Sequence, residues 1–188
     1  EDWGPGFRNG QKRWTSADVP PALRKDAWKE YEIGHTGCHG CPLRCKNVIQ
    51  IPNGPRKGEV GEGLEYEAIH WLGINSGILD PIAIMEMSNY ADQQGMDVIG
   101  LGSVVGFAKE LYEQGIITTD DTGGISLDWE EYDSQKLLIT MIAERKGFGD
   151  LLALGMAGLA EKLGEDAARY CFDVKGVTRG VYPSGIYS

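Results

Sequence analysis

Long apolar runs and an excess of basic residues are both missing from this sequence. No apolar run reaches the roughly 18 residues that a membrane span needs, and Glu1-Asp2-Trp3 does not begin a signal peptide. Lysine and arginine total 18 against 28 acids, which gives a formal net charge of −10. Such a surface repels phosphates. We therefore expect no membrane and no nucleic-acid partner.

Cysteines are too few, and too unevenly spaced, to build a disulfide framework. The sequence holds four, and three of them fall within residues 38–45. That clustering is typical of a metal or cluster site whose thiolates require a reducing compartment, so we expect a cytoplasmic protein. Hydrophobic residues make up 41% of the 188 residues, which is enough for a packed core.

Internal repeats and low-complexity tracts are also absent, and helical signals dominate the second half of the chain. Glycine and proline punctuate residues 1–20 and predict an irregular lead-in. Asp80-Pro81 is a helix start, with aspartate as N-cap and proline in the first turn. The predicted helices span residues 21–31, 81–94, 102–114, 128–145 and 150–163, and the predicted strands residues 48–51 and 170–174. We predict a mainly α fold over residues 21–188: an irregular helical domain with a cysteine loop and few short strands.

The cysteine loop carries the strongest chemical signal. Cys38, Cys41 and Cys45 form a C-x2-C-x3-C run that can wrap one corner of a [4Fe–4S] cube. Arg44 and Lys46 add positive charge beside an anionic cluster. Zinc, with His35 or His39 as fourth ligand, is the alternative, although a second C-x2-C pair is absent. Three unligated thiols remain a third interpretation.

Cys171 stands apart from the other three cysteines. It lies in the apolar run 170–174, which favours a buried small hydrophobic residue over a ligand.

Further motifs follow the cysteine loop in a fixed order, and the ordered set resembles the tungsten-containing aldehyde:ferredoxin oxidoreductase family. More distantly it resembles the tungsten subunit of benzoyl-coenzyme A reductase. The resemblance covers essentially all of residues 7–176. The motifs are Leu64-Glu65-Tyr66-Glu67-Ala68, then Asn89-Tyr90-Ala91-Asp92-Gln93-Gln94-Gly95-Met96-Asp97, then Phe107 to Gly115, Gly147 to Gly155, and Val174-Lys175-Gly176.

This resemblance implies a tungsten (less often molybdenum) ion held by two pyranopterins, with a [4Fe–4S] cluster nearby. It implies oxidation of a small aldehyde to a carboxylic acid, with electrons passed to ferredoxin. It places Asp92, Gly95 and Asp97 in a pterin-binding motif and Lys175 beside the cofactor. It makes Glu67 the active-site carboxylate, a proton acceptor whose pKa we expect burial to raise, with Glu65 as the neighbouring candidate.

The resemblance also implies pieces that this chain lacks. The family's fourth cluster cysteine and a later histidine lie beyond it, and an N-terminal β-rich domain precedes it. We therefore expect the chain to be part of a longer enzyme and to be inactive when isolated. Family members often form dimers, but no histidine follows His70 to support a metal bridge between subunits. A free-standing iron–sulfur electron carrier and a zinc-stabilised interaction module remain the competing interpretations.

Overall fold

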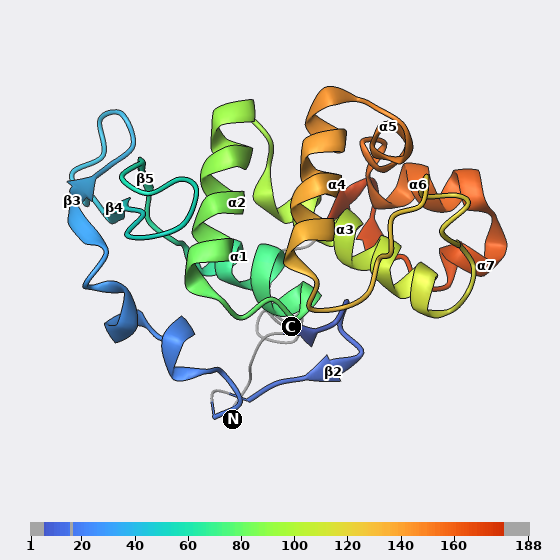
Figure 1. Ribbon diagram of the computed structural model, residues 1–188, viewed down its shortest axis with the longest axis horizontal. Coiled ribbons are helices and arrows are strands. Elements are labelled where there is room, and N and C mark those ends of the chain that lie inside the picture. Colours follow the sequence, from blue (N-terminus) through green and yellow to red (C-terminus); the bar gives the residue numbers. More distant parts are fainter. Residues whose placement is uncertain (1–5, 16, 179–188) are drawn as a thin grey trace.

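Helices form the body of the molecule, and the predicted mainly α class is confirmed (Figure 1). The computed structural model describes residues 6–15 and 17–178. Residues 1–5, 16 and 179–188, which belong to the predicted lead-in and to the end of the predicted domain, lie outside the described residues. The α-helices of the described part are α1 (Tyr66–Ala68), α2 (Pro81–Gln94), α3 (Val98–Glu113), α4 (Tyr132–Glu144), α5 (Phe148–Leu152), α6 (Gly155–Leu163) and α7 (Glu165–Ala168).

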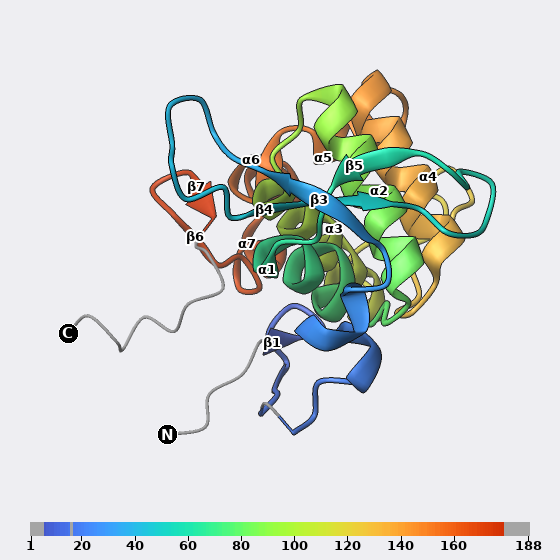
Figure 2. The same cartoon turned by 90° about the vertical axis from the view of Figure 1, so that its left-hand side faces the viewer.

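Strands are short and pair only with near neighbours in the chain. The largest sheet has the order β3-β4-β5 and is antiparallel throughout, and Figure 2 shows it lying across one side of the helices. The strands are β1 (Gly6–Phe7), β2 (Lys12–Arg13), β3 (Glu32–Thr36), β4 (Lys46–Gln50), β5 (Val60–Glu62), β6 (Asp173–Val174) and β7 (Val177–Thr178). The pairs β1–β2 and β6–β7 are separate antiparallel hairpins.

Helix α2 begins and ends where the sequence predicts. The Asp80 carboxylate accepts a hydrogen bond from the backbone N–H of Ile82 at 2.9 Å, and Pro81 occupies the first turn. The helix ends at Gly95, whose φ of 69° lies in the left-handed region that glycine adopts without steric cost. The cap and the terminating glycine therefore set both ends of α2.

Helix α3 packs with unusually close backbone contact on the segment that precedes α2. This segment continues α1 through a π-helical turn, η3 (Ile69–Gly73), and a 3-10 turn, η4 (Ile74–Ser76). A β-carbon at Gly102 would overlap the backbone of Trp71, and one at Gly106 would overlap the side chain of Asn75. The two glycines thus allow the two segments to touch.

The apolar side chains of the helices meet in one core. Its fully buried members include Leu72 of η3, Met85 of α2, Phe107 of α3 and Leu138 of α4. Within the described residues, no helix is long and apolar enough to cross a membrane.

Several predicted element boundaries are wrong. The predicted helix over residues 21–31 is two 3-10 turns, η1 (Pro21–Leu23) and η2 (Lys25–Trp28), because Arg24 between them is extended, with φ −88° and ψ 149°. Helix α3 starts four residues before the predicted position, at the Asp97 cap. The predicted helix over 150–163 is divided into α5 and α6 before Gly155, whose φ is 76°.

The predicted strands also differ in extent from those observed. The strand predicted at 48–51 is confirmed as β4, displaced by one or two residues. The strand predicted at 170–174 shrinks to the two residues of β6. Strands β3 and β5, which flank β4, were not predicted; β5 lies in a glycine-rich acidic stretch without apolar alternation.

Candidate functional site

The three clustered cysteines lie on the loop that joins β3 to β4. The pair of residues next to the loop is Thr36↔Lys46, and the strands stay paired from there on, so the loop is the tip of a β-hairpin. A turn forms inside it, because the Cys41 N–H donates to the Cys38 carbonyl oxygen at 3.0 Å. Across its base, Arg44 Nη2 donates to the His35 carbonyl oxygen at 2.9 Å. The loop is therefore tied to its own sheet.

The thiols are accessible but do not form a ready ligand set. Cys38 and Cys45 are exposed and Cys41 is half-buried. Among residues 6–15 and 17–178, no group of three or more His, Cys, Asp or Glu side chains is placed to hold a metal ion. The donor chemistry still suits an iron–sulfur cluster, which thiolates bind. His35 Nε2 lies 2.7 Å from Glu32 Oε1, so that imidazole is already engaged by its own strand.

Two of the predicted cofactor residues meet in a cavity of about 370 Å³ between β5 and the C-terminal end of α2. We call it the β5–α2 cavity. It is lined by Lys46, Val60, Gly61, Glu62, Asn89, Asp92, Gln93, Gly95 and Met96. Asp92 and Gly95 are in this list, and Lys46 directly follows the last loop cysteine. The structure thus brings Asp92 and Gly95 of the predicted pterin motif next to Lys46, the first residue of the strand that leaves the cysteine loop.

Charges around the β5–α2 cavity are coupled to one another. Asp92 is exposed at the rim, yet the partial burial of its carboxyl raises its pKa. Repulsion from Glu62 and Glu65 adds to this rise, and Lys46 opposes it. Lys46 Nζ lies 2.5 Å from Glu62 Oε2. The hydrogen bond that Lys46 donates to Glu62 raises the pKa of Lys46. Partial burial opposes this rise, and the electrostatic effects of Cys38 and Glu65 reinforce it.

The other two predicted cofactor residues lie elsewhere. Asp97 caps α3, its carboxylate accepting from the Gly100 N–H at 2.6 Å. It lines a second cavity, of about 680 Å³, between α3, α5–α6 and the β6–β7 hairpin. Lys175 is exposed in the turn of that hairpin, where both it (φ 57°) and Gly176 (φ 79°) are left-handed, as a type I′ turn requires. Met96 lines both cavities and separates the two halves of the predicted motif.

The predicted catalytic carboxylate, Glu67, lies in the single turn of α1. It is half-buried, and its Oε2 accepts a hydrogen bond from the indole Nε1 of Trp71 at 2.8 Å. Glu65 precedes the helix as its N-cap residue, is exposed, and makes no side-chain cap bond. Glu67 lines neither of the two cavities above. The Glu67 side chain is thus held by the buried Trp71 indole.

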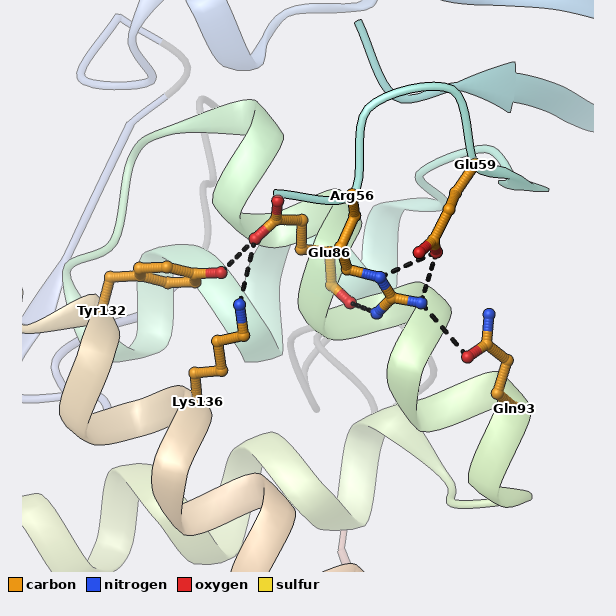
Figure 3. Close-up of polar contacts among 6 residues, drawn as sticks. All are labelled: Arg56, Glu59, Glu86, Gln93, Tyr132 and Lys136. Atoms are coloured by element: carbon orange, nitrogen blue, oxygen red, sulfur yellow. Dashed lines mark hydrogen bonds and ion pairs between the residues drawn. The ribbon is translucent and has the colours of Figure 1, made fainter. Parts of the chain in front are cut away.

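A polar cluster on the other face of α2 escaped the sequence analysis. Figure 3 shows Tyr132 and Lys136 of α4 pointing at the buried carboxylate of Glu86, with a hydrogen bond from Tyr132 and a 3.5 Å ion pair with Lys136. Arg56 Nη1 donates to the Glu86 carbonyl oxygen at 3.1 Å. Burial, followed by the hydrogen bond to Glu86, raises the pKa of Tyr132.

Asn89 begins the predicted motif over residues 89–97, but the sequence analysis assigned it no role. It lies one turn after Glu86 and is also buried, at the wall of the β5–α2 cavity. A signal was present, since Glu86 and Asn89 are polar residues three apart within the apolar pattern of α2.

Comparisons with known proteins find a matching family model and similar sequences. The family model "Aldehyde ferredoxin oxidoreductase, domains 2 & 3" matches residues 6–187. A tungsten-containing aldehyde ferredoxin oxidoreductase of Pyrococcus horikoshii is 41% identical over 136 residues, covering 71% of this chain and 22% of its own length. The WOR-like subunit of an aliphatic sulfonate oxidoreductase of Pyrococcus furiosus is 34% identical over 162 residues, covering 84% of this chain and 24% of its own length.

A solved structure shares the fold. The active site complex BamBC of benzoyl coenzyme A reductase, in complex with 1,5-dienoyl-CoA, superposes with a TM-score of 0.68 at 23% identity. The match covers 90% of this chain and 25% of that one. This chain thus spans about a quarter of the length of the proteins it matches. Since the family model covers nearly every residue, the chain belongs to the aldehyde ferredoxin oxidoreductase family of oxidoreductases.

Proposed function

We propose that residues 21–188 are the central helical domain of a longer tungsten (or molybdenum) pterin enzyme, with residues 1–20 leading into it. The enzyme oxidises small aldehydes to carboxylic acids and passes the electrons to ferredoxin. The observation that carries this proposal is the family match over residues 6–187, combined with relatives of which the matched part of this chain covers only about a quarter. Because the remaining domains complete the site, the isolated chain is expected to be inactive. A homodimer of the full enzyme is part of the proposal.

The cysteine loop is the proposed cluster site. Cys38, Cys41 and Cys45 supply three thiolates to a [4Fe–4S] cluster, and the fourth ligand comes from outside this chain. A bound cluster supplies one-electron transfer between the reaction centre and an external carrier. The loop holds the thiols of Cys38 and Cys45 exposed and that of Cys41 half-buried, so an assembling cluster can reach all three.

The β5–α2 cavity is the proposed contact with one pterin. The Asp92 carboxylate at its rim suits the amine and amide donors of a pterin ring, and Gly95 allows a ring to approach the end of α2. Asp97 lines the second cavity, and Lys175 lies in the β6–β7 hairpin beside that cavity. Both are proposed to contact the cofactor on the side away from Asp92.

Glu67 is the proposed proton acceptor. Oxidation of an aldehyde takes up one water and releases two electrons and two protons, so a base beside the reacting carbon speeds the reaction. The Glu67 carboxylate takes one proton while the Trp71 indole N–H holds its Oε2 in place.

Reconstitution of the chain with iron and sulfide under anaerobic conditions tests the cluster assignment. We expect a brown, labile cluster containing iron and acid-labile sulfide, since three cysteines leave one iron open to solvent or an external thiol. Cys38→Ser is expected to abolish it. Cys171→Ser is the matched control, because Cys171 packs against the helical core and is not on the loop.

Other outcomes separate the competing functions. Equal loss of the cluster in both variants would make Cys171 the fourth ligand and favour a free-standing electron carrier. Zinc bound at one equivalent, with no uptake of iron and sulfide, would replace the enzyme proposal with a zinc-stabilised module.

A further inference from the structure

Helix α2 carries a buried carboxamide without hydrogen-bond partners at the wall of the β5–α2 cavity. Asn89 is 2% exposed, and neither its Nδ2 nor its Oδ1 has a partner within the described residues. Asn75 is buried to a similar degree, but its Nδ2 donates to the Gly102 carbonyl oxygen at 3.3 Å. The described residues therefore satisfy the buried amide of Asn75 and leave that of Asn89 unpaired.

The unpaired amide of Asn89 indicates a partner other than the residues that the structure describes. Buried polar side chains in folded proteins are nearly always hydrogen-bonded, and an exception calls for an explanation such as a bound molecule. An asparagine amide offers two donors and one acceptor oxygen. A matching ligand thus presents an acceptor and a donor side by side.

The β5 backbone lies close to the Asn89 carboxamide, and the cavity beside it opens at the end of α2. Strand β5 packs against its carboxamide at Gly61, where a β-carbon would overlap Oδ1 and Nδ2. Nothing lies within 4 Å of a β-carbon built at Gly95, so the far end of α2 is open. Between them the cavity is lined by polar side chains, including Asp92 and the Lys46–Glu62 ion pair. A flat polar ring fits such a lining better than an apolar ligand.

We propose that Asn89 is a binding residue of the β5–α2 cavity that reads the donor–acceptor edge of a planar nitrogen heterocycle. Its Oδ1 accepts from a ring N–H or amine, and its Nδ2 donates to the adjacent ring carbonyl or nitrogen. This inference rests on the proposed function, because the aminopyrimidinone ring of a pterin has such an edge. It gives a role to Asn89, the first residue of the predicted motif and one turn before Asp92.

The test compares two buried asparagines in two measurements. Asn89→Leu and Asn75→Leu both replace an amide with an apolar group of similar size. Thermal unfolding is recorded on the cofactor-free chain. Pterin per enzyme is measured on the full-length parent by the fluorescence of the oxidised pterin released on denaturation.

We expect the two variants to behave in opposite ways. Asn89→Leu removes an unpaired buried amide, so the unfolding temperature of the cofactor-free chain stays the same or rises. Its pterin content falls about tenfold, the factor that corresponds to 1.4 kcal/mol of lost binding. Asn75→Leu removes a satisfied amide, so the unfolding temperature falls, while the folded enzyme keeps its pterin.

The outcomes that overturn the inference are distinct from those that overturn the proposed function. Full pterin content in Asn89→Leu, with pterin present in the wild type, removes the role of Asn89 alone. A lower unfolding temperature of the cofactor-free Asn89→Leu chain would show a purely structural amide and also overturns it. A wild-type parent enzyme without pterin overturns the proposed function and this ligand together.

Discussion

Glu67 and Glu65 are two residues apart and differ in what holds them. Glu67 accepts from the Trp71 indole, whereas Glu65 stays exposed at the start of α1. In the full-length enzyme, we expect Glu67→Gln to keep its cofactors but to lower kcat by roughly 10²–10⁴, the usual contribution of general base catalysis. The measurement is steady-state aldehyde oxidation together with metal and pterin analysis.

Glu65→Gln is the matched control and should leave kcat close to that of the wild type. If Glu65→Gln lost the rate and Glu67→Gln kept it, the roles of the two carboxylates would be exchanged. Full rate in both variants would leave the family assignment in place and remove the proposed base.

In the proposed function, Asp92 binds the pterin through the negative charge of its carboxylate. Asp92→Asn keeps the shape of the side chain but removes the anion, so we expect lower pterin content in the full-length enzyme. Because burial and the neighbouring acids raise the pKa of Asp92, the carboxylate is protonated sooner than an ordinary aspartate as the pH falls. Pterin retention should therefore decline toward acid pH in the wild type and change less in the variant.

Asp120 provides the comparison for Asp92. It is exposed on the loop between α3 and α4, away from both cavities, so Asp120→Asn should retain the wild-type pterin content at every pH. An equal loss in both aspartate variants would point to a general effect of net charge.

At the scale of elements, the contact between α3 and η3 depends on the absence of a side chain. Gly102→Ala places a β-carbon inside the backbone of Trp71, which cannot move without shifting η3. Overpacking of this kind typically costs about 1–3 kcal/mol, which exceeds the gain of up to about 1 kcal/mol that alanine brings to a helix. We expect a net loss of stability in chemical denaturation of the chain.

Gly34→Ala in β3 is the control, because nothing lies within 4 Å of a β-carbon built there. It should change the free energy of unfolding by less than Gly102→Ala. A stabilised Gly102→Ala variant would mean that α3 and η3 are packed less closely than described.

At the scale of the whole molecule, one buried lysine links stability to pH. Lys109 of α3 is fully buried, and its Nζ donates to the Asp128 carbonyl oxygen at 2.8 Å. Burial lowers its pKa to about 8, although Glu131, Asp128 and Glu130 favour the charged form. Below pH 8 both the folded and the unfolded chain carry this proton, so the burial penalty is fully present.

Above pH 8 only the unfolded chain keeps the proton, up to its ordinary pKa of 10.5. Stability should therefore rise with pH between 8 and 10, by about 1.4 kcal/mol per pH unit from this group. Denaturant titrations at several pH values measure it. Lys109→Met should remove this rise, and exposed Lys57→Met should keep it. A wild-type profile that matches Lys109→Met would contradict the lowered pKa.

The sequence determined the features that depend on local chemistry and on order along the chain. The Asp80 cap, the Gly95 end of α2 and the helical periodicity of α3 and α4 are set by neighbouring residues, and each prediction is confirmed within a few residues. The family assignment rested on motifs in sequence order, and the family model that matches residues 6–187 confirms it. Local signals failed where the chain is irregular, as at Arg24 and in the glycine-rich stretch that forms β5.

Only the tertiary structure decided which of the predicted site residues meet. Asp92 and Asp97 are five residues apart, but the turn at Gly95 sends them to different cavities. Asn89 became a candidate only when β5, about thirty residues earlier, packed over it and supplied no hydrogen bond. Such facts depend on contacts between distant segments, because burial and hydrogen-bond satisfaction are properties of the packed chain and not of any local pattern.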